Sequence, residues 1–322
     1  MKSIDELRTL VEQELLSLKY PSTPADLYAP IDYILSLGGK RMRPILLLLS
    51  YQLYNKKDVK AALRPAIAIE VFHNFTLLHD DIMDEAPVRR GQSTVHTKWN
   101  ENVAILSGDA MLIQSYQYLS ELPKESLIEC LSVFNTMALK VCEGQQYDMD
   151  FEIQAEVDLK SYLKMIEYKT AVLLGASLKM GAIIGGGAKE DADNLYEFGR
   201  KIGIAFQLKD DLLDVFGDTN AFGKQLGGDI IANKKTCLYL KALSLSDGSE
   251  KMELVNLYSS ETINSTEKVE KVKQIYASLE IETHINELIN EYYENAMKSL
   301  NAIGKDTSEL ENFAALLKIR ES

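Results

Sequence analysis

Two short stretches of the sequence carry three aspartates each at the same spacing. LLHDDIMDEAPVRRG covers residues 77–91 and FQLKDDLLD covers residues 206–214. The aspartates are Asp80, Asp81, Asp84, Asp210, Asp211 and Asp214. At 3.6 residues per turn, residues four positions apart lie on one face of a helix. Each stretch therefore predicts a pair of carboxylates one turn apart on a helix, and the two pairs could face each other across a bundle.

Clusters of like charge beside apolar helices are unfavourable unless a cation neutralises them. Oxygen-only ligation suits Mg²⁺, which keeps several waters and is usually completed by phosphate oxygens, whereas zinc or non-haem iron sites normally include histidine. In a chain with 48 acidic residues, one such cluster is as often a solvated helix face. The repeat, with a long apolar stretch before each cluster, favours a metal-dependent phosphate site.

Basic residues supply the complementary charge in four segments. These are GGKRMRP at 38–44, RRG at 89–91, EYKTAVLLGA at 167–176 and GKQLGGDIIANKKT at 223–236. Each is individually more often a surface charge than a ligand. Together they predict two sites for polyphosphate anions. The first segment, GGKRMRP, lies at a predicted helix start, where free backbone N–H groups also favour anions.

Composition narrows the class of protein. The chain has 322 residues, 46% of them hydrophobic, and a formal charge of −13. The negative charge argues against nucleic acid and anionic membrane surfaces as partners. The N-terminal residues lack the order of a signal peptide, and the longest apolar run, ILLLL, is too short to span a bilayer. We therefore expect a cytoplasmic protein without stable membrane insertion, with its three cysteines as buried free thiols.

Helical periodicity dominates the chain, and no segment shows convincing two-residue alternation. Ser3 and Glu6 have the spacing of a capping box at the start of the first helix. Further helices are predicted at 26–36, 43–54, 60–85, 101–120, 124–149, 158–184, 189–216, 232–245, 250–258, 266–279 and 282–302. No low-complexity linker divides the sequence, so it predicts one all-α domain over residues 1–322.

The sequence resembles the trans-isoprenyl diphosphate synthases, also called polyprenyl synthetases, from about residue 30 to 240. The motifs are GGKRMRP, HDDIMD followed by RRG, EGQQYD, YKT, FQLKDDLLD and GKQLGGDIIANKKT. The resemblance implies the isoprenoid synthase fold, a bundle of long helices around a central cavity. Gln145 and Asp148 match the family pattern without an assigned role. Asn233 stands where the family often has glycine, and both residues tolerate a left-handed backbone.

The resemblance also implies roles for the motif residues. The six aspartates form the metal-binding set for three Mg²⁺ ions, with Mn²⁺ as a substitute. Asp80, Asp84 and Asp210 would be direct ligands, and Asp81, Asp211, Asp214 and Asp229 would act behind them or through water. The allylic diphosphate would be held by Arg89, Lys169, Lys224 and Lys234. Isopentenyl diphosphate would be held by Lys40, Arg43, His73 and Arg90, while Lys169, Thr170 and Gln207 would line the position of the allylic cation.

The implied activity is that of a short-chain trans-prenyltransferase, similar to geranylgeranyl and farnesyl diphosphate synthases. It would condense isopentenyl diphosphate with dimethylallyl, geranyl or farnesyl diphosphate through ionisation, condensation and elimination. In this family the chain grows along the helix that carries the first aspartates. Phe75 and Phe72 would lie about 7.5 Å and about 12 Å from Asp80 along that helix. By the resemblance, a bulky Phe75 implies a short-chain product, and we expect C20 with C15 as the alternative. Both phenylalanines could instead be ordinary core residues, with the tunnel floor near Ser115 and Leu119 or across the dimer interface.

The resemblance leads to one further expectation, a homodimer, and leaves two alternative functions, a terpene cyclase and a non-catalytic subunit. The family associates through long helices, so we expect a homodimer. The apolar run at 101–149 could serve both core and interface, although core packing alone would also explain it. A terpene cyclase needs only one diphosphate site and would lack GGKRMRP. A non-catalytic subunit of a heteromeric synthase, which would bind prenyl diphosphates without turnover, typically loses one aspartate cluster. Both clusters are intact here, which favours the enzyme.

Overall fold

The computed structural model describes residues 1–56, 58–217, 226–259 and 263–319. Within these residues almost all regular structure is helical, and one two-stranded hairpin is present. The all-α prediction is confirmed. No helix in this described part has both the length and the apolar character needed to cross a membrane.

The hairpin strands are β1 (Val88–Arg89) and β2 (Gln92–Ser93). The helices are α1 (Ile4–Ser17), α2 (Ala25–Ser36), α3 (Met42–Tyr54), η1 (Val59–Ala62), α4 (Leu63–Met83), α5 (Val95–Lys98), α6 (Glu101–Ser120), α7 (Lys124–Ile153), α8 (Leu159–Ile166), η2 (Glu167–Ala171), α9 (Val172–Gly185), α10 (Lys189–Phe216), α12 (Gly228–Ile231), α13 (Cys237–Leu245), α14 (Gly248–Ser259), α15 (Ser265–Ser278), α16 (Ile281–Asn301) and α17 (Ser308–Ile319).

Contacts within the chain divide it into two compact units. Unit 1 contains residues 1–136, 176–196 and 303–309, and unit 2 contains 137–175, 197–302 and the segment from Leu310 onward. Helices α7, α9 and α10 contribute residues to both units. The expectation of one domain over the whole chain stays a prediction.

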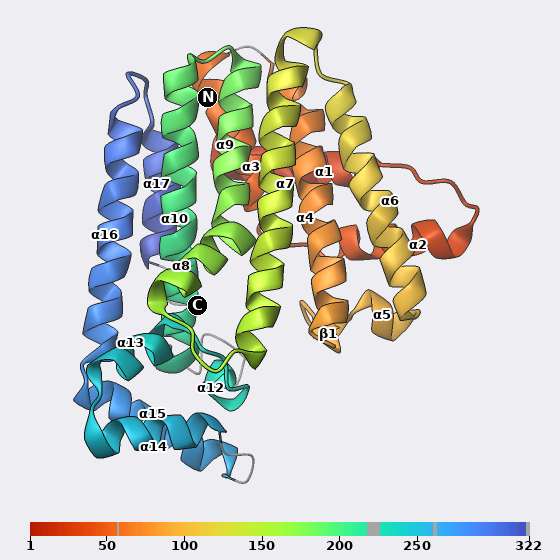
Figure 1. Ribbon diagram of the computed structural model, residues 1–322. Coiled ribbons are helices and arrows are strands. Elements are labelled where there is room, and N and C mark those ends of the chain that lie inside the picture. The colour runs from red at the N-terminus through yellow and green to blue at the C-terminus, as the bar shows by residue number, and fades with distance from the viewer. Residues whose placement is uncertain (57, 218–225, 260–262, 320–322) are drawn as a thin grey trace. The chain divides into compact units, whose positions relative to one another are not determined.

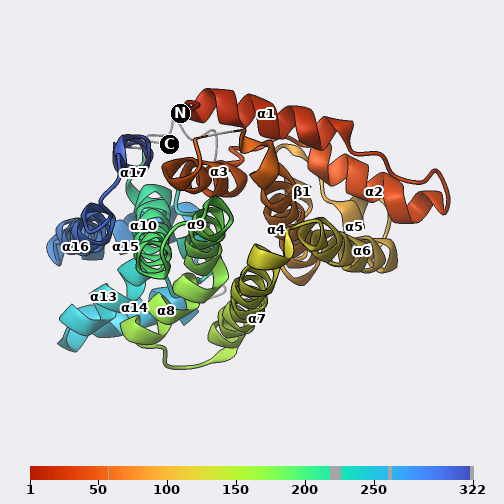
Figure 2. The same cartoon turned by 90° about the horizontal axis from the view of Figure 1, so that it is seen from above.

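The core of unit 1 is built around α3 and α4. Every residue from Pro44 to Leu53 is buried, as expected for a helix that is apolar around its whole circumference. Helix α4 contacts α3 and lies beside α6 (Figure 1 and Figure 2). The Ser50 hydroxyl donates to the Leu178 carbonyl at 2.6 Å. Helix α4, which carries the first aspartates, is thus held from several sides.

The core of unit 2 joins the C-terminal part of α10 to α8, α13, α15 and α16. Gly203 of α10 packs directly on Ala171, because a Cβ at residue 203 would lie 2.6 Å from the Ala171 Cα. The Tyr258 and Tyr276 hydroxyls form a buried hydrogen bond of 2.9 Å between α14 and α15. These contacts fix the helix that carries the second aspartates.

The structure corrects several predicted boundaries. The helix expected at 60–85 begins with the 3-10 turn η1, and α4 proper ends at Met83. The helix expected at 158–184 is interrupted by η2, a π-helical turn. The helix expected from residue 232 begins only at Cys237, because Asn233 adopts a left-handed φ of 58°.

Three other features differ from the sequence expectations. The hairpin β1–β2 and the helix α17 were absent from the predicted elements. Two-residue strands carry no periodic signal, so the hairpin is not recognisable from alternation. Cys142 is exposed, which corrects the expectation that all three cysteines are buried, whereas Cys130 and Cys237 are buried.

Candidate functional site

The first aspartate cluster lies at the C-terminal end of α4. Asp80 and Asp81 occupy the last turn, and Asp84 is the C-cap residue, with its N–H donating to the Asp80 carbonyl at 2.9 Å. Helix C-termini carry partial negative charge, so carboxylates there add to an already negative potential. The cluster therefore favours a cation.

The members of this cluster face different surroundings. Asp81 is only 2% exposed, and its carboxylate accepts hydrogen bonds from the Arg89 Nε at 2.8 Å. The Arg89 Nη2 lies 2.6 Å from Asp81 Oδ1 and 3.7 Å from Asp80 Oδ2. Asp80 is half-buried and Asp84 is exposed. Hairpin β1–β2 thus pins the middle aspartate with an arginine and leaves Asp80 and Asp84 more accessible.

The second aspartate cluster lies in the last two turns of α10. Asp211 is 4% exposed and accepts hydrogen bonds from the Tyr162 hydroxyl and, at 3.3 Å, from the Gln207 Nε2. Burial raises the pKa of Asp211 to about 7, and the hydrogen bonds from these neutral donors oppose that rise without cancelling it. Asp210 and Asp214 are half-buried. As in the first cluster, the middle carboxylate is buried and its neighbours are more accessible.

Asp214 also organises the turn that follows α10. Its Oδ2 accepts from the Asp229 N–H at 3.0 Å, and its carbonyl accepts from the Gly227 N–H at 2.7 Å. Lys234 is 56% exposed, with Nζ 3.8 Å from Asp229 Oδ1. Asp229 and Lys234 therefore belong to one structured turn. Lys224, the other lysine predicted in this segment, lies outside the described residues.

Lys169 and Thr170 lie in the π-helical turn η2. The Lys169 Nζ is 2.6 Å from Asp148 Oδ2, one helical turn along α7 from Gly144. A Cβ at Gly144 would lie 2.2 Å from the Lys169 backbone nitrogen, so only glycine allows α7 to approach this turn so closely. Sequence reasoning gave Asp148 no role. The signal was available in the four-residue spacing of EGQQYD, which puts Gly144 and Asp148 on one face of α7.

Gln207 has a defined amide orientation. The Gln207 Nε2 donates to Asp211 Oδ1 at 3.3 Å, so the amide nitrogen faces Asp211. The amide oxygen then faces Thr170, whose hydroxyl donates to it at 3.5 Å. The structure thus brings Thr170 and Gln207 together within unit 2, with the Thr170 Oγ1 and the Gln207 Oε1 facing each other.

The predicted basic residues of unit 1 gather around His73. The Arg43 Nη1 lies 3.0 Å from the His73 Nε2, and the Arg90 guanidinium donates to the Gly38 carbonyl. Burial and then the charge of Arg43 depress the pKa of His73 well below its ordinary value, so its ring is neutral and accepts from Arg43. Burial also lowers the pKa of Arg43 to about 10. Lys40, in the same loop, is exposed.

Arg41 anchors this basic loop, a role that sequence reasoning missed. Its side chain is buried, with Nη1 2.6 Å from Glu70 Oε1 and Nη2 donating to the Leu35 carbonyl at 2.7 Å. Arg41 itself has a left-handed φ of 49°. The buried pair fixes the start of α3 to α4, and thereby places Arg43 beside His73. No local sequence pattern indicates which arginine of KRMR turns inward.

Aromatic rings form a row beside the first aspartates. Ring centroids are 5.1 Å apart for Phe134 and Phe72, 5.6 Å for Phe72 and Phe75, and 4.8 Å for Phe75 and His79. Phe72 is buried and Phe75 is half-buried. His79 packs against Gly108 of α6, where a Cβ would lie 2.3 Å from its Nε2. Both phenylalanines are therefore part of one packed aromatic row in unit 1.

The donor chemistry of both clusters fits a hard divalent cation. The accessible side chains offer carboxylate oxygens alone, at the negative ends of two helices. Within the described residues, no group of three or more His, Cys, Asp or Glu side chains is arranged to hold a metal by itself. Mg²⁺ normally takes one or two protein carboxylates together with waters and phosphate oxygens, so such a compact cage is not required.

Comparisons with known proteins give a consistent result. The family model described as Polyprenyl synthetase matches residues 24–279. The chain is 39% identical over 247 residues to the geranylgeranyl diphosphate synthase of Methanosarcina mazei, which covers 75% of this chain and 76% of that protein. It is 37% identical over 257 residues to the geranylfarnesyl diphosphate synthase of Natronomonas pharaonis, which covers 74% and 75% respectively.

Among solved structures, the chain resembles a crystal structure of a geranylgeranyl pyrophosphate synthase. The TM-score is 0.94 at 44% sequence identity, and the match covers 100% of both chains. A second resembles it closely as well, the geranylgeranyl pyrophosphate synthetase from Pyrococcus horikoshii Ot3, with a TM-score of 0.92 at 32% identity. That match covers 99% of this chain and 97% of the other.

Proposed function

Because the chain belongs to the polyprenyl synthetase family, it is a short-chain trans-prenyltransferase, and we propose that its product is the C20 compound geranylgeranyl diphosphate. Its substrates are prenyl diphosphates. We propose isopentenyl diphosphate as the donor of each five-carbon unit and dimethylallyl, geranyl and farnesyl diphosphates as acceptors. The observation that carries the proposal is the pair of intact aspartate clusters, each at the C-terminal end of a long helix.

Members of this family usually require a divalent metal, and we propose three Mg²⁺ ions, which Mn²⁺ can replace. Asp80, Asp84 and Asp210 would bind them directly. Asp81 and Asp211 are buried and accept hydrogen bonds from neighbouring side chains, which supports a role behind the direct ligands rather than as direct ligands. Asp214, which accepts from the Asp229 N–H, would act in the same way. When bound, the ions would neutralise the charge of the diphosphate leaving group.

The chain's own cations are proposed to hold the two diphosphates. Arg43, His73 and Arg90, with Lys40, would bind isopentenyl diphosphate, and their grouping around one loop of unit 1 supports this. Lys169 and Lys234, together with Arg89 and Lys224, would bind the allylic diphosphate. Lys169 supports this assignment because a second element, α7, determines its position through Gly144 and Asp148.

In the proposed reaction, the C1–O bond of the allylic substrate breaks and its electron pair leaves with the diphosphate. Lys169 stabilises the anion that develops. The Gln207 and Thr170 oxygens offer lone pairs to the allylic cation without a basic nucleophile nearby. The double bond of isopentenyl diphosphate then attacks C1. The new bond forms at C4 of isopentenyl diphosphate and leaves a cation at its C3. C2 then loses a proton to the released diphosphate, and the C–H electron pair forms the C2=C3 double bond.

We assign the control of product length to Phe75 and Phe72. The aromatic row they form with Phe134 supports a rigid floor, since packed rings cannot move aside without opening a cavity. Half-burial of Phe75 supports its position as the first barrier. The Natronomonas pharaonis relative is a geranylfarnesyl diphosphate synthase, which makes C25 the alternative to C20 that the test must separate.

A homodimer in the cytoplasm completes the proposal. Large apolar side chains are exposed on α6, with Ile105 at 42%, Leu106 at 60% and Ile113 at 61%. Leu106 and Ile113 are seven residues apart and so lie on one face of α6, which supports a second copy of the chain as its cover. Light scattering at micromolar concentrations would give twice the chain mass, and a monomer would refute the dimer.

Sizing the products of the purified chain tests the function. The chain is incubated with Mg²⁺, isopentenyl diphosphate and each allylic primer in turn. We expect C20 from the wild type, longer products from Phe75→Ala and longer still from the double variant with Phe72→Ala. No elongation of any primer would refute the enzyme activity. A C15 or C25 wild-type product, or chain lengths unchanged by both substitutions, would refute the assignment of product length.

A further inference from the structure

The turn between α12 and α13 has an unusual residue at its tip. Asn233 adopts a left-handed φ of 58°, and its N–H donates to the Ile230 carbonyl at 3.2 Å. The next N–H, of Lys234, donates to the Asp229 carbonyl at 2.9 Å. Glycine would adopt this conformation without strain, and asparagine tolerates it. Backbone sterics therefore do not explain an asparagine at the tip, so its side chain is the feature to explain.

That side chain meets a buried lysine from another helix. The Asn233 Oδ1 accepts a hydrogen bond from the Nζ of Lys268 on α15. Lys268 is only 4% exposed, and its Nζ lies 5.3 Å from the centroid of the Tyr258 ring. A buried ammonium group requires acceptors, and a bond from a charged donor is stronger than a neutral one. The Asn233 amide is therefore held by a charge-assisted hydrogen bond.

Helix α15 supports the same turn at its other end. Val269, the neighbour of Lys268, packs against Gly227, where a Cβ would lie 2.8 Å from the Val269 Cγ1. Helices α12 and α15 are in contact, and Figure 1 shows them close together. Two consecutive residues of α15 thus hold the start and the tip of the segment that contains Asp229. Asp214 holds that segment from the side of α10 through the Asp229 N–H.

We propose that Lys268 is a positioning residue for the allylic diphosphate site, which acts by holding the Asn233 side chain and thereby fixing the turn that presents Lys234. This inference rests on the proposed function, because it takes Lys234 as a ligand of the allylic diphosphate. Lys234 is 56% exposed and has a long flexible side chain. Its Nζ can be directed only if the backbone beneath it is fixed. Lys268 does not itself contact substrate.

A double-mutant cycle separates this role from simple packing of α15. The variants are Lys268→Met, which keeps the length of the side chain without its charge, Asn233→Gly, which keeps the turn without the acceptor, and the double variant. Each single variant breaks the same contact. We expect both to raise the KM for the allylic substrate about fivefold to tenfold, with the KM for isopentenyl diphosphate changed less than twofold. The double variant should be no worse than the poorer single variant.

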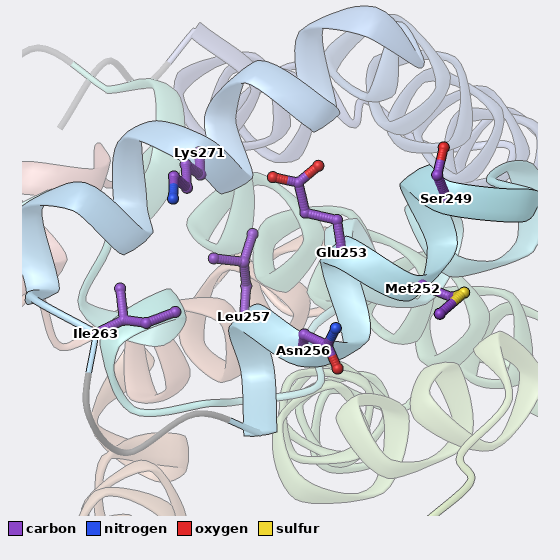
Figure 3. A pocket seen from close by; sticks show the side chains of 7 residues that line it. All are labelled: Ser249, Met252, Glu253, Asn256, Leu257, Ile263 and Lys271. Carbon is purple, nitrogen blue, oxygen red and sulfur yellow. The ribbon is translucent and has the colours of Figure 1, made fainter.

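Lys271→Met is the matched control. Lys271 lies on the same helix, where its side chain is 43% exposed and pairs with Glu267 at 2.8 Å. It lines a surface hollow of about 350 Å³ together with residues of α14 and Ile263 (Figure 3), and no residue of the turn belongs to that lining. This variant should leave both KM values unchanged. Effects of Lys268→Met and Asn233→Gly that simply multiply in the double variant, or an equal effect of Lys271→Met, would overturn the proposal.

Two further measurements keep the test decisive. Hydrogen exchange of the backbone amides at 228–236 should accelerate about tenfold in Asn233→Gly, which changes only an exposed residue and should fold even if Lys268→Met does not. Unchanged exchange in this variant would overturn the positioning role. Lys234→Ala tests the premise separately: an unchanged allylic KM would refute the assigned function of Lys234, whereas a raised KM with no effect of Lys268→Met or Asn233→Gly would refute only the inference.

Discussion

The two aspartate clusters share a sequence pattern and differ in how their middle carboxylate is satisfied. Asp81 is held by the guanidinium of Arg89, which lies eight residues later in the chain. Asp211 is held by the hydroxyl of Tyr162 and the amide of Gln207, which carry no charge. Burial raises the pKa of both carboxylates; the charge and hydrogen bond of Arg89 oppose the rise at Asp81, whereas only hydrogen bonds from neutral donors oppose it at Asp211.

The difference shows that one motif can serve two structural purposes. In unit 1 the middle aspartate ties a hairpin, and its arginine, to the end of α4. In unit 2 the middle aspartate sets the orientation of the Gln207 amide. In both units the first and third aspartates of the cluster remain more accessible than the middle one. We infer that metal binding is common to the two clusters and that the buried carboxylate serves each unit separately.

The largest expected effect follows from replacing the accessible aspartates. Asp80→Asn and Asp210→Asn should each lower kcat by a factor on the order of 10³, because the diphosphate would leave with less neutralisation. Steady-state assays measure the loss, and circular dichroism should show an unchanged helical content. A near wild-type kcat in either variant would mean that only one cluster takes part.

Replacing the middle aspartate should lower the unfolding free energy by different amounts in the two clusters. Asp81→Asn leaves the Arg89 guanidinium without its buried partner and should cost about 3 kcal/mol of unfolding free energy. Asp211→Asn keeps a neutral acceptor for Tyr162 and should cost only about 1 kcal/mol. Urea denaturation measures both values. Equal losses would show that the different partners of the two carboxylates have no energetic consequence.

Two glycines beside the clusters provide a smaller contrast. Gly144→Ala would place a Cβ 2.2 Å from the Lys169 backbone nitrogen, whereas Gly108→Ala would meet the end of the His79 side chain. A ring can turn aside more easily than a backbone can move. Gly144→Ala should therefore lower kcat at least about tenfold, and Gly108→Ala less than about threefold. The reverse order in kinetic assays would contradict the role given to α7.

The smallest expected effect concerns acid stability in unit 1. The folded-state pKa of His73 is well below that of the unfolded chain, so unfolding takes up a proton below about pH 6.5. The contribution of the neutral ring is complete above that pH and is lost as the pH falls. Between pH 6.5 and 5.5, His73→Gln should lose about 1 kcal/mol less stability than the wild type. Parallel curves for the two proteins would show that folding does not lower the pKa of His73.

The sequence correctly predicted the features that depend on residues close together in the chain. The helix period and the four-residue spacing placed Asp80 with Asp84 and Asp210 with Asp214, and the structure puts both pairs at helix ends. It could not identify the hydrogen bond from Tyr162, because that residue is separated from Asp211 by 49 positions. The buried pair of Arg41 and Glu70 was missed for the same reason.

Backbone irregularities also escaped prediction. The π-helical turn η2 has the composition of an ordinary helix, and Gly144 of α7 closely approaches its backbone. The left-handed conformation at Asn233 was anticipated from residue type, since asparagine tolerates it. Its partner Lys268 was not anticipated, because a lysine in a polar helix normally indicates a solvated face. Such features depend on tertiary packing and carry no periodic signal.

The most direct test of whether both clusters hold a metal-bound diphosphate is calorimetric binding of a thio analogue of farnesyl diphosphate. In this analogue sulfur replaces the bridging oxygen, so the bond to the diphosphate does not break. The wild type, Asp80→Asn and Asp210→Asn are each titrated in Mg²⁺ and in excess chelator. We predict that the wild type binds only with Mg²⁺ and that each variant binds at least about 100-fold more weakly, a loss of about 2.7 kcal/mol. Binding that survives chelation, or that is unchanged in either variant, would contradict this account.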